Sequence, residues 1–542
     1  RPDVPELKAG SRYLVEVVVR TLGIGHPFSQ GTVDSNEIWV ELTARSGERV
    51  IGHSGGMGSD DVVDPYSHFI NVYMLDRDGN RIDRRNPQDI FVPLYNKQIP
   101  PGAGQVVHFG LDLPTSETGP ITLEAKVNYR KFDRTYLDYI FGKGQGPKLP
   151  VVVMARDQVS LPVHGGPPVT NPPSPIEATW QRYNDYGIGL FLEGASKGGQ
   201  KGELKQAEHI FLKVAELGRA DGWVNLARVF QREGRIPDAL SALEKAANHK
   251  EPAAPWVINW LTGQINASNG LLDDAITSFE SVLSTKIPAR KFDFSLDYRV
   301  INDLGSALYA RARSEFPVVS ATRRDFLHRA IAAYRRTLAI DSEDVGAHWG
   351  LAQAYYQAWV DQANGATQTE PESGVKDEPV EPETLVKQAT TIADPKVAAL
   401  KRRELALQLA RGITRFMNGE RPRYQSRLEP LHDIVEILGR AWEAETDPQN
   451  QAALARALEV AHRRLHERLK PDETAEGRAF ALARQKDPAA NHNSESIVIH
   501  SLHRPGAPGS SQAVATAAIA RTNENPTNTA ATARPPAPEY RK

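Results

Sequence analysis

Four histidines in the first part of the chain are the side chains best suited to do chemistry. His26 lies in the stretch GIGHPFSQG, and His53, His68 and His108 follow it. A neutral imidazole can ligate a metal, and an imidazole that titrates near neutral pH can carry a proton. The plainer interpretation is structural. His26 would then shape a glycine-flanked turn by bonding to the backbone, while His68 and His108 would be surface or satisfied core residues of alternating strands.

Two groups of acidic residues could hold a hard cation through their oxygen atoms. The first resembles a calcium loop, but the helix-loop-helix spacing with a glutamate at the twelfth position is missing. We favour a hairpin turn there, because Asp-Gly and Gly-Asn are preferred in such turns. The second group lies in a glycine-rich loop, where a solvated acidic loop is the alternative that we favour. The groups are Asp76, Asp78, Asn80 and Asp83, and Asp60, Asp61 and Asp64.

The composition excludes several classes of site. The chain has no cysteine, so disulfides, thiolate metal sites, thiol nucleophiles and covalent haem attachment through Cys-x-x-Cys-His are ruled out. The formal net charge is -2, from 65 basic and 67 acidic side chains, and shows no footprint for nucleic acid. No run of about 18 apolar residues predicts a membrane span. No nucleophile elbow, phosphate-binding loop, dinucleotide fingerprint or zinc-protease motif favours an enzyme.

The histidines and acidic groups lie in a region, residues 1–163, that is predicted to form an antiparallel β-sandwich. Apolar and polar residues alternate in short runs rich in Val, Ile and Tyr, such as SRYLVEVVVRTL, NEIWVELTA and ITLEAKVNYR. Period two places one face of each strand inward and the other toward water. Six or more such runs separated by turn signals favour a sandwich. Residues 164–177 are rich in proline and are predicted to form a linker.

From residue 178 the pattern changes to the period of a helix. Trp223, Leu226, Ala227 and Phe230 share one helical face, and similar large and small residues recur in later units. The small residue allows the two helices of a hairpin to approach closely, and several hairpins must stack to bury their apolar faces. This pattern resembles the tetratricopeptide repeat. Residues 178–363 are therefore expected to form an all-α superhelix of such repeats, with a generic helical bundle as the alternative.

A superhelix of this kind presents an extended concave surface that suits the binding of a peptide or a folded protein. Polar residues in the first helix of each hairpin are the candidates for contacting such a partner. These candidates are Asn225, Arg228, Asn259, Asn302 and Gln353.

Three further segments follow the repeats. Residues 364–394 are acidic and proline-rich, which predicts a disordered insertion. A helical pattern resumes over residues 395–486 and predicts further repeats or a cap. Residues 487–542 consist largely of Ala, Pro, Thr, Asn and Ser with almost no aromatic residues, so a disordered tail is predicted there.

The β region also resembles a particular family. The stretch GIGHPFSQGTVDSNEIWVEL is followed by SGG, by DPYSHFINVYMLDRDGN and by IPPGAGQVVHFGLDLP. This order resembles the β-sandwich domain appended to many bacterial multihaem c-type cytochromes. In that family a Gly-His-x-x-Pro-x-Gly stretch precedes a Trp-bearing strand, and an Asp-x-Asp-Gly hairpin follows. Here proline directly follows His26, and Ser29 occupies the later proline position. Some members of that group also carry tetratricopeptide repeats.

The resemblance implies proximity to haem rather than possession of it. A chain without cysteine cannot tether c-type haem, but His26, and less directly His68, could be an axial ligand of a haem held by another segment or chain. The implied partners are proteins, among them a multihaem c-type cytochrome. The implied location is the bacterial periplasm or the extracellular space. Because the chain opens with Arg1 rather than methionine, we expect a signal peptide or an upstream domain to have been removed.

Two hypotheses follow. In the first, the chain is a protein-interaction scaffold of a multihaem cytochrome assembly for electron transfer, or its haem-free C-terminal part. In the second, it is a general exported adaptor with a ligand-binding β-sandwich and no redox role. Neither hypothesis requires the chain to be an enzyme.

Overall fold

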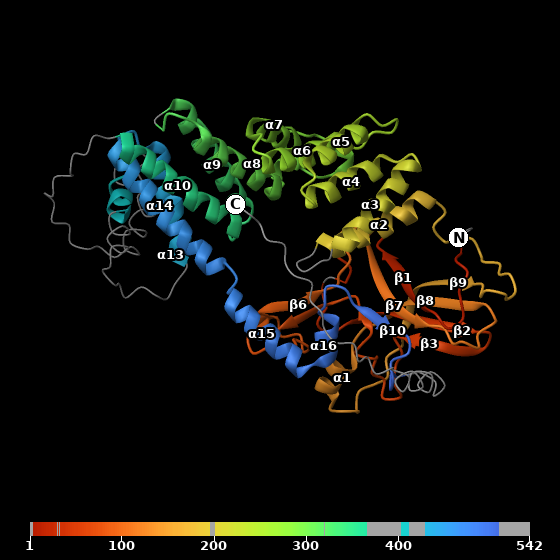
Figure 1. Cartoon of the computed structure of the whole chain (residues 1–542). Coiled ribbons are helices and arrows are strands. Elements are labelled where there is room, and N and C mark those ends of the chain that lie inside the picture. The colour runs from red at the N-terminus through yellow and green to blue at the C-terminus, as the bar shows by residue number, and fades with distance from the viewer. Residues whose placement is uncertain are drawn as a thin grey trace, which may run out of the picture. The chain divides into compact units, whose positions relative to one another are not determined.

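The chain forms two compact units in the computed structural model (Figure 1). We call residues 1–217 together with 473–542 the β unit, and residues 218–472 the helical unit. The helical unit is thus inserted in the sequence of the β unit. None of the described helices is both long and apolar enough to cross a membrane. The structure describes residues 4–29, 31, 33–195, 201–318, 320–365, 403–410 and 429–508.

Antiparallel strands form the core of the β unit, as the alternating sequence predicts. One sheet has the order β3-β2-β8-β9, with β4 also paired to β2, and another has the order β1-β7-β10. A separate two-stranded sheet is formed by β5 and β6. The strands are β1 (Arg12–Arg20), β2 (Glu37–Ser46), β3 (Arg49–Ser54), β4 (His68–Phe69), β5 (Val72–Leu75), β6 (Val92–Asn96), β7 (Gly104–Asp112), β8 (Ile121–Arg130), β9 (Val152–Leu161) and β10 (Ile499–Ser501).

Alternate residues of these strands build the core of the sandwich. Val40 and Leu42 of β2 and Phe109 and Leu111 of β7 are almost completely buried and belong to one apolar cluster. Strand β2 runs antiparallel to β8, with Val40 opposite Val127. Because side chains on a strand alternate between faces, this register brings the apolar residues of both strands to the same side.

The C-terminal part of the β unit returns to the sandwich after the helical unit. Strand β10 pairs in parallel with β7, and the carbonyl oxygen of Leu502 accepts a hydrogen bond of 2.8 Å from the backbone N–H of His53 on β3. One segment therefore contacts the edges of both sheets. The fully buried side chain of Leu502 completes the core between them. We call residues 499–508 the strap.

Two helices precede the strap and cover the small sheet. Helix α15 (Glu473–Lys486) contacts β6, and α16 (Pro488–Asn493) follows it (Figure 1). Ala479 and Ala483 of α15 pack in a cluster with residues of β5 and β6. The predicted boundary at residue 487 differs from the structure, because residues up to 508 are held by a few buried apolar side chains and by β pairing. The remainder of the predicted tail lies outside the described residues.

Paired helices form the helical unit. The hairpins are α4 with α5, α6 with α7, and α8 with α9, followed by α10, which packs on α14, and by α13. Another hairpin, α2 with α3, belongs to the β unit, where α2 packs on β7 and β1. The helices are α2 (Thr179–Ala195), α3 (Lys201–Glu216), α4 (Ala220–Arg232), α5 (Ile236–Ala247), α6 (Pro255–Ser268), α7 (Leu272–Leu283), α8 (Tyr298–Ser314), α9 (Ala321–Ile340), α10 (Val345–Gly365), α13 (Glu429–Ala444) and α14 (Pro448–Leu469).

The packing within hairpins follows the small-to-aromatic rule that the sequence predicts. A Cβ added to Gly263 of α6 would lie 2.6 Å from the ring of Phe279 on α7, and a Cβ on Gly305 of α8 would lie 2.9 Å from the ring of Tyr334 on α9. The helices approach this closely because glycine has no side chain. This arrangement of repeated hairpins is the tetratricopeptide-type fold.

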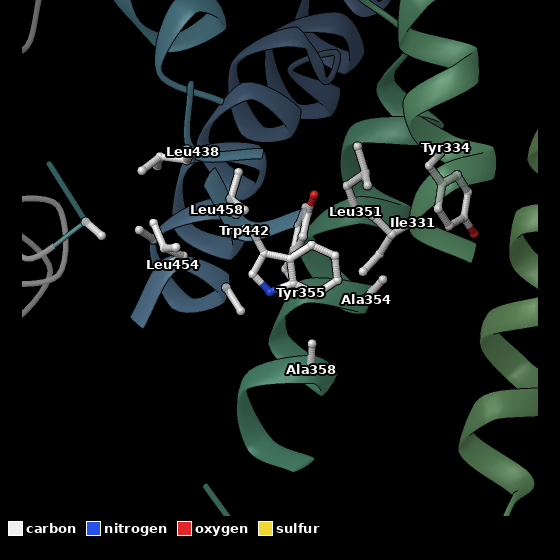
Figure 2. Close-up of a cluster of buried hydrophobic side chains, with 14 of the residues drawn as sticks. Ile331, Tyr334, Leu351, Ala354, Tyr355, Ala358, Leu438, Trp442, Leu454 and Leu458 are labelled. Atoms are coloured by element: carbon white, nitrogen blue, oxygen red, sulfur yellow. The ribbon is translucent and has the colours of Figure 1, made fainter. Parts of the chain in front are cut away.

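The last part of the helical unit has its own core, shown in Figure 2. Tyr355 of α10 and Trp442 of α13 meet edge to face with ring centroids 5.3 Å apart, beside Leu454 and Leu458 of α14. Residues 429–469 therefore extend the repeat array. The acidic insertion predicted over residues 364–394 lies outside the described residues after the end of α10.

Candidate protein-interaction site

The first helices of successive hairpins, α4, α6, α8 and α10, lie next to one another in the helical unit. We call the surface that they form the first-helix face. These four helices contain all five residues that the sequence predicts to contact a partner.

On α4, the two predicted residues contact each other. Arg228 is half-buried and donates a hydrogen bond of 3.2 Å from Nη1 to the side-chain oxygen of Asn225. Asn225 is buried, with 8% of its surface exposed. Burial lowers the pKa of the Arg228 guanidinium. Of this pair, Arg228 is thus the more accessible to a partner.

On α6 and α8, two of the predicted amides bond to neighbouring elements of the array. Asn259 donates a hydrogen bond of 2.8 Å to the hydroxyl oxygen of Ser281 on α7. Asn302 donates one of 3.1 Å to a carboxylate oxygen of Asp344, just before α10. Both amides are half-buried. These contacts hold adjacent helices in position, a role that the sequence did not indicate.

The junction of α6 and α8 contains a polar contact that the sequence analysis missed. Gln264 of α6 donates a hydrogen bond of 3.2 Å to a carboxylate oxygen of Asp303 on α8. Burial raises the pKa of the Asp303 carboxyl, and the bond from Gln264 opposes this rise. The contact links consecutive repeats along the first-helix face.

Exposed aromatic side chains flank Gln353 on α10. Trp349 and Tyr356 are each 44% exposed, and Gln353 between them is half-buried. Their spacing of four and three residues places all three on one stripe of the helix. The ring of Trp349 lies 4.9 Å from that of His466 on α14. Aromatic residues are enriched at protein interfaces, and the spacing could have identified this stripe from the sequence.

In the β unit, His26 lies in the connection between β1 and β2 with an exposed side chain. Its Nδ1 is 3.0 Å from the carbonyl oxygen of Pro27. A carbonyl only accepts hydrogen bonds, so Nδ1 carries the proton and Nε2 of the neutral ring keeps its lone pair. The backbone contact agrees with the structural interpretation of His26, and the exposed Nε2 retains the ability to ligate.

The structure places His68 in a buried group with two residues that the sequence analysis did not connect to it. Its Nε2 is 3.2 Å from Oε1 of Gln105, and its ring meets that of His500 edge to face at 5.4 Å. Burial, with a contribution from Lys97, holds the pKa of His68 well below its usual value. Burial likewise lowers the pKa of His500 to about 3. Both rings are therefore neutral at physiological pH and lie in the interior.

His108 of β7 joins the sandwich to α2. Its ring nitrogens form ion pairs of 3.3 Å with Glu16 of β1 and 3.0 Å with Glu193 of α2. Tyr186 of α2 also donates a hydrogen bond to Glu16. Burial alone would lower the pKa of His108, but the two carboxylates raise it to about 9. His108 is thus a protonated structural bridge.

His53 and the carboxylates of the first acidic group have structural partners. His53 of β3 is 3.0 Å from a carboxylate oxygen of Glu41. Asp76 accepts hydrogen bonds from the backbone N–H groups of Asp78 and Asn80, which confirms the predicted hairpin turn. Lys486 of α15 donates a bond of 2.7 Å to the side-chain oxygen of Asn80.

Arginines pair with two carboxylates of the second acidic group, and Asp60 accepts a hydrogen bond from the backbone N–H of Val62. Asp61 pairs with Arg130 at 3.0 Å, and Asp64 pairs with Arg504 of the strap. In the part of the chain that the structure describes, no group of three or more potential ligands is arranged to hold a metal ion.

No protein-family model matches the sequence, and no curated protein is significantly similar to it. Among solved structures, the chain is similar to a thermophilic tetratricopeptide repeat protein of Thermus thermophilus, with 16% identity and a TM-score of 0.22 over 44% of this chain and 98% of that one. It is also similar to human IFIT1 in a dimer with m7Gppp-AAAA, with 14% identity and a TM-score of 0.27. This match covers 56% of this chain and 64% of the IFIT1 chain. The chain thus spans less than two thirds of IFIT1. A third similar structure is native alpha-2-macroglobulin from Escherichia coli, spanning domain MG7 to the C-terminus. It matches with 12% identity and a TM-score of 0.16, over 84% of this chain and 64% of that one.

Proposed function

We propose that this chain is a protein-interaction scaffold rather than a catalyst, and that the first-helix face of its helical unit binds partner proteins. The observation that carries the proposal is the stripe of Trp349, Gln353 and Tyr356 on α10. Two aromatic side chains that are each 44% exposed flank an amide there. Large aromatic side chains bury much area at a low cost in conformational entropy, and they dominate binding energy at interfaces.

Site-specific photocrosslinking tests this proposal. A benzophenone amino acid replaces Trp349 or Tyr356 in the full chain expressed in its native cells, and crosslinked proteins are identified by mass spectrometry. Leu271 is the matched control position, because it is 45% exposed in the same unit but lies between α6 and α7. We expect defined protein adducts from positions 349 and 356. The double variant Trp349→Ala, Tyr356→Ala should reduce affinity for the purified partner about 30-fold or more, as loss of anchoring residues does. Equal adducts from position 271 would contradict a specific surface.

We further propose that the partner assembly contains a multihaem c-type cytochrome and works in electron transfer in the bacterial periplasm or extracellular space. The support is the resemblance of the β unit around His26. The residues fit a haem held elsewhere, because the side chain of His26 is exposed, its Nδ1 contacts the carbonyl of Pro27, and the chain has no cysteine for its own attachment. A haem, when bound, would supply the electron-transfer chemistry. His26 would contribute only an axial nitrogen, oriented by its bond to Pro27.

Visible spectroscopy of the complex tests this more specific proposal. The chain is copurified with its cytochrome partner, and the haem spectrum is compared between wild type and His26→Ala. His164, which is also exposed, is the matched control. A change in the haem bands with His26→Ala alone supports ligation. A complex without haem would leave the scaffold proposal intact but would refute the redox assignment and favour the general adaptor.

A further inference from the structure

The connection between α7 and α8, residues 284–297, is long compared with the connection between α5 and α6, residues 248–254. It contains two short 3-10 turns, Pro288–Arg290 and Phe294–Leu296. Ordered loops of this length that carry exposed side chains are often functional. We call residues 286–298, which include the first residue of α8, the α7–α8 loop.

The α7–α8 loop exposes large apolar side chains although it is anchored by others. Phe292 is 50% exposed, Leu296 is 55% exposed and Tyr298 is 37% exposed. Phe294 is buried, and its ring centroid lies 5.3 Å from that of Trp256 on α6. Phe294 therefore fixes the loop on the array. Folding alone does not require three further apolar side chains to remain in water.

The loop also carries cations, and one more cation contacts it from a neighbouring helix. Arg290 lies over the ring of Trp256, 5.0 Å from its centroid, and Arg336 of α9 donates a hydrogen bond to the carbonyl oxygen of Ser295. Lys286 and Lys291 are exposed in the loop. In the part of the chain that the structure describes, none of these four cations forms an ion pair.

The two acids of the loop are used as caps. Asp293 accepts a hydrogen bond of 3.0 Å from the backbone N–H of Ser295. Asp297 is the N-cap of α8 and accepts bonds from the N–H groups of Arg299 and Val300. The cations Lys286 and Arg336 also act on Asp293. The loop thus combines exposed apolar anchors with an excess of cations over two acids that bind backbone.

We propose that the α7–α8 loop is a second docking surface, and that it binds an acidic protein segment carrying an aromatic or aliphatic anchor. The charge of the surface selects the acidic partner, and Phe292 and Leu296 receive the anchor. This inference rests on the proposed scaffold function and specifies the chemistry of one partner.

The geometry favours an acidic peptide over a nucleic acid. Binding of nucleic acid requires a stripe of cations that follows many consecutive phosphates. Here three cations lie in one loop and Arg336 contacts it from α9, while the same loop exposes aliphatic Leu296. A short segment with several carboxylates and one apolar anchor satisfies both features.

A peptide array tests the proposal on the full chain. The array carries 12-residue peptides with net charges from about -6 to +6, each with and without a central phenylalanine. Because the chain has no cysteine, Ala289→Cys can carry a single environment-sensitive dye in the loop. Ala247→Cys, exposed on α5, is the matched label away from it. Soluble versions of the bound peptides are then titrated against both labelled proteins.

We expect acidic peptides with the central phenylalanine to bind and to change the dye signal at position 289 only. Phe292→Ser should weaken binding about 30-fold, the loss typical of an anchoring side chain. The double reversal Arg290→Glu, Lys291→Glu should weaken it at least tenfold and remove its salt dependence. The variant Trp349→Ala should leave this binding unchanged, which separates the loop from the first-helix face.

Three results would overturn the proposal. The array would show no preference for acidic peptides, or Phe292→Ser would bind as wild type does. Alternatively, a single-stranded oligonucleotide would displace the peptides and bind more tightly than any of them. None of these results bears on the stripe on α10, because the crosslinking experiment tests that surface separately.

Discussion

The ring of Phe279 on α7 lies directly against Gly263 of α6, where a Cβ on the glycine would be 2.6 Å from ring atom Cε1. Gly263→Ala is therefore expected to destabilise the helical unit by about 1–3 kcal/mol, because the methyl group forces the two helices apart. Thermal unfolding followed by far-UV circular dichroism measures this change.

The control for this substitution is Gly477→Ala in α15, where a Cβ would have nothing within 4 Å. Alanine favours a helix over glycine by about 1 kcal/mol, so this variant should be neutral or more stable. If both variants are equally stable, close packing at Gly263 is not what joins α6 to α7.

Leu502 of the strap is predicted to stabilise the sandwich strongly. Its side chain is fully buried against the core and lies close to Gly52 of β3. Leu502→Ala should lower the free energy of unfolding of the β unit by about 2–5 kcal/mol. Ile499→Ala in the same segment removes a side chain that is 52% exposed and should cost less than about 1 kcal/mol. Chemical denaturation of both variants tests whether the strap belongs to the core.

Arg130 is predicted to be essential for the interior of the β unit. It is fully buried, with Nε 2.9 Å from Glu37 and Nη1 3.0 Å from Asp61. Burial raises the pKa of Glu37 to about 7 even though Arg130 opposes the rise. Arg130→Met leaves both carboxyls without their partner and should cost about 3–5 kcal/mol.

The matched control for Arg130 is Arg156→Met on the surface. Arg156 pairs with Glu124, but its side chain is 59% exposed, so its loss should cost less than about 1 kcal/mol. Equal effects in denaturant titrations would show that the buried pairs contribute no more than exposed ones.

His108 is predicted to make the stability of the β unit depend on pH. Its folded pKa of about 9 lies above the ordinary value of 6.5, so the protonated bridge stabilises the fold fully below pH 6.5. As the pH rises toward 9, the unfolded chain has already lost this proton, and stability falls by up to about 1.4 kcal/mol per pH unit. Burial lowers the pKa of Lys97 to about 7, which has the opposite effect above that pH.

The measurement must therefore be a difference between two proteins. The stability advantage of wild type over His108→Gln should shrink as the pH rises from 6.5 to 9, since Lys97 is common to both. An advantage that is constant over this range would mean that the ring is not protonated in the fold. A titration of the ring by NMR gives an independent value.

The sequence predicts the elements whose partners are close along the chain. The alternation in β2 and β8 identifies strands, because apolar residues mark the face turned to the core and polar residues mark the face turned to water. The spacing of Gly263 and Phe279 identifies a helical hairpin because both belong to adjacent helices. The spacing of Trp349 and Tyr356 alone also indicates the aromatic stripe, although the prediction names only Gln353 from it.

The contacts of the histidines could not be predicted, because their partners are remote in sequence. His68 meets His500, and His108 meets Glu193 of α2. No local pattern indicates which residue will lie opposite a strand once the chain has folded. For the same reason, the sequence does not indicate that the amides of Asn259 and Asn302 bond to Ser281 and Asp344. That these two residues contact a partner stays a prediction.

By itself the sequence determined the two kinds of secondary structure, the repeat character and the absence of thiol chemistry, because periodicity and composition are local properties. Only the tertiary structure decided that residues 473–508 return to complete the β unit, and that Leu502 fills a core begun hundreds of residues earlier. The strap is short, so its few large apolar residues carry no detectable period. Burying them is favourable only after β7 and β3 have formed, because the strap pairs with the edges of these two strands.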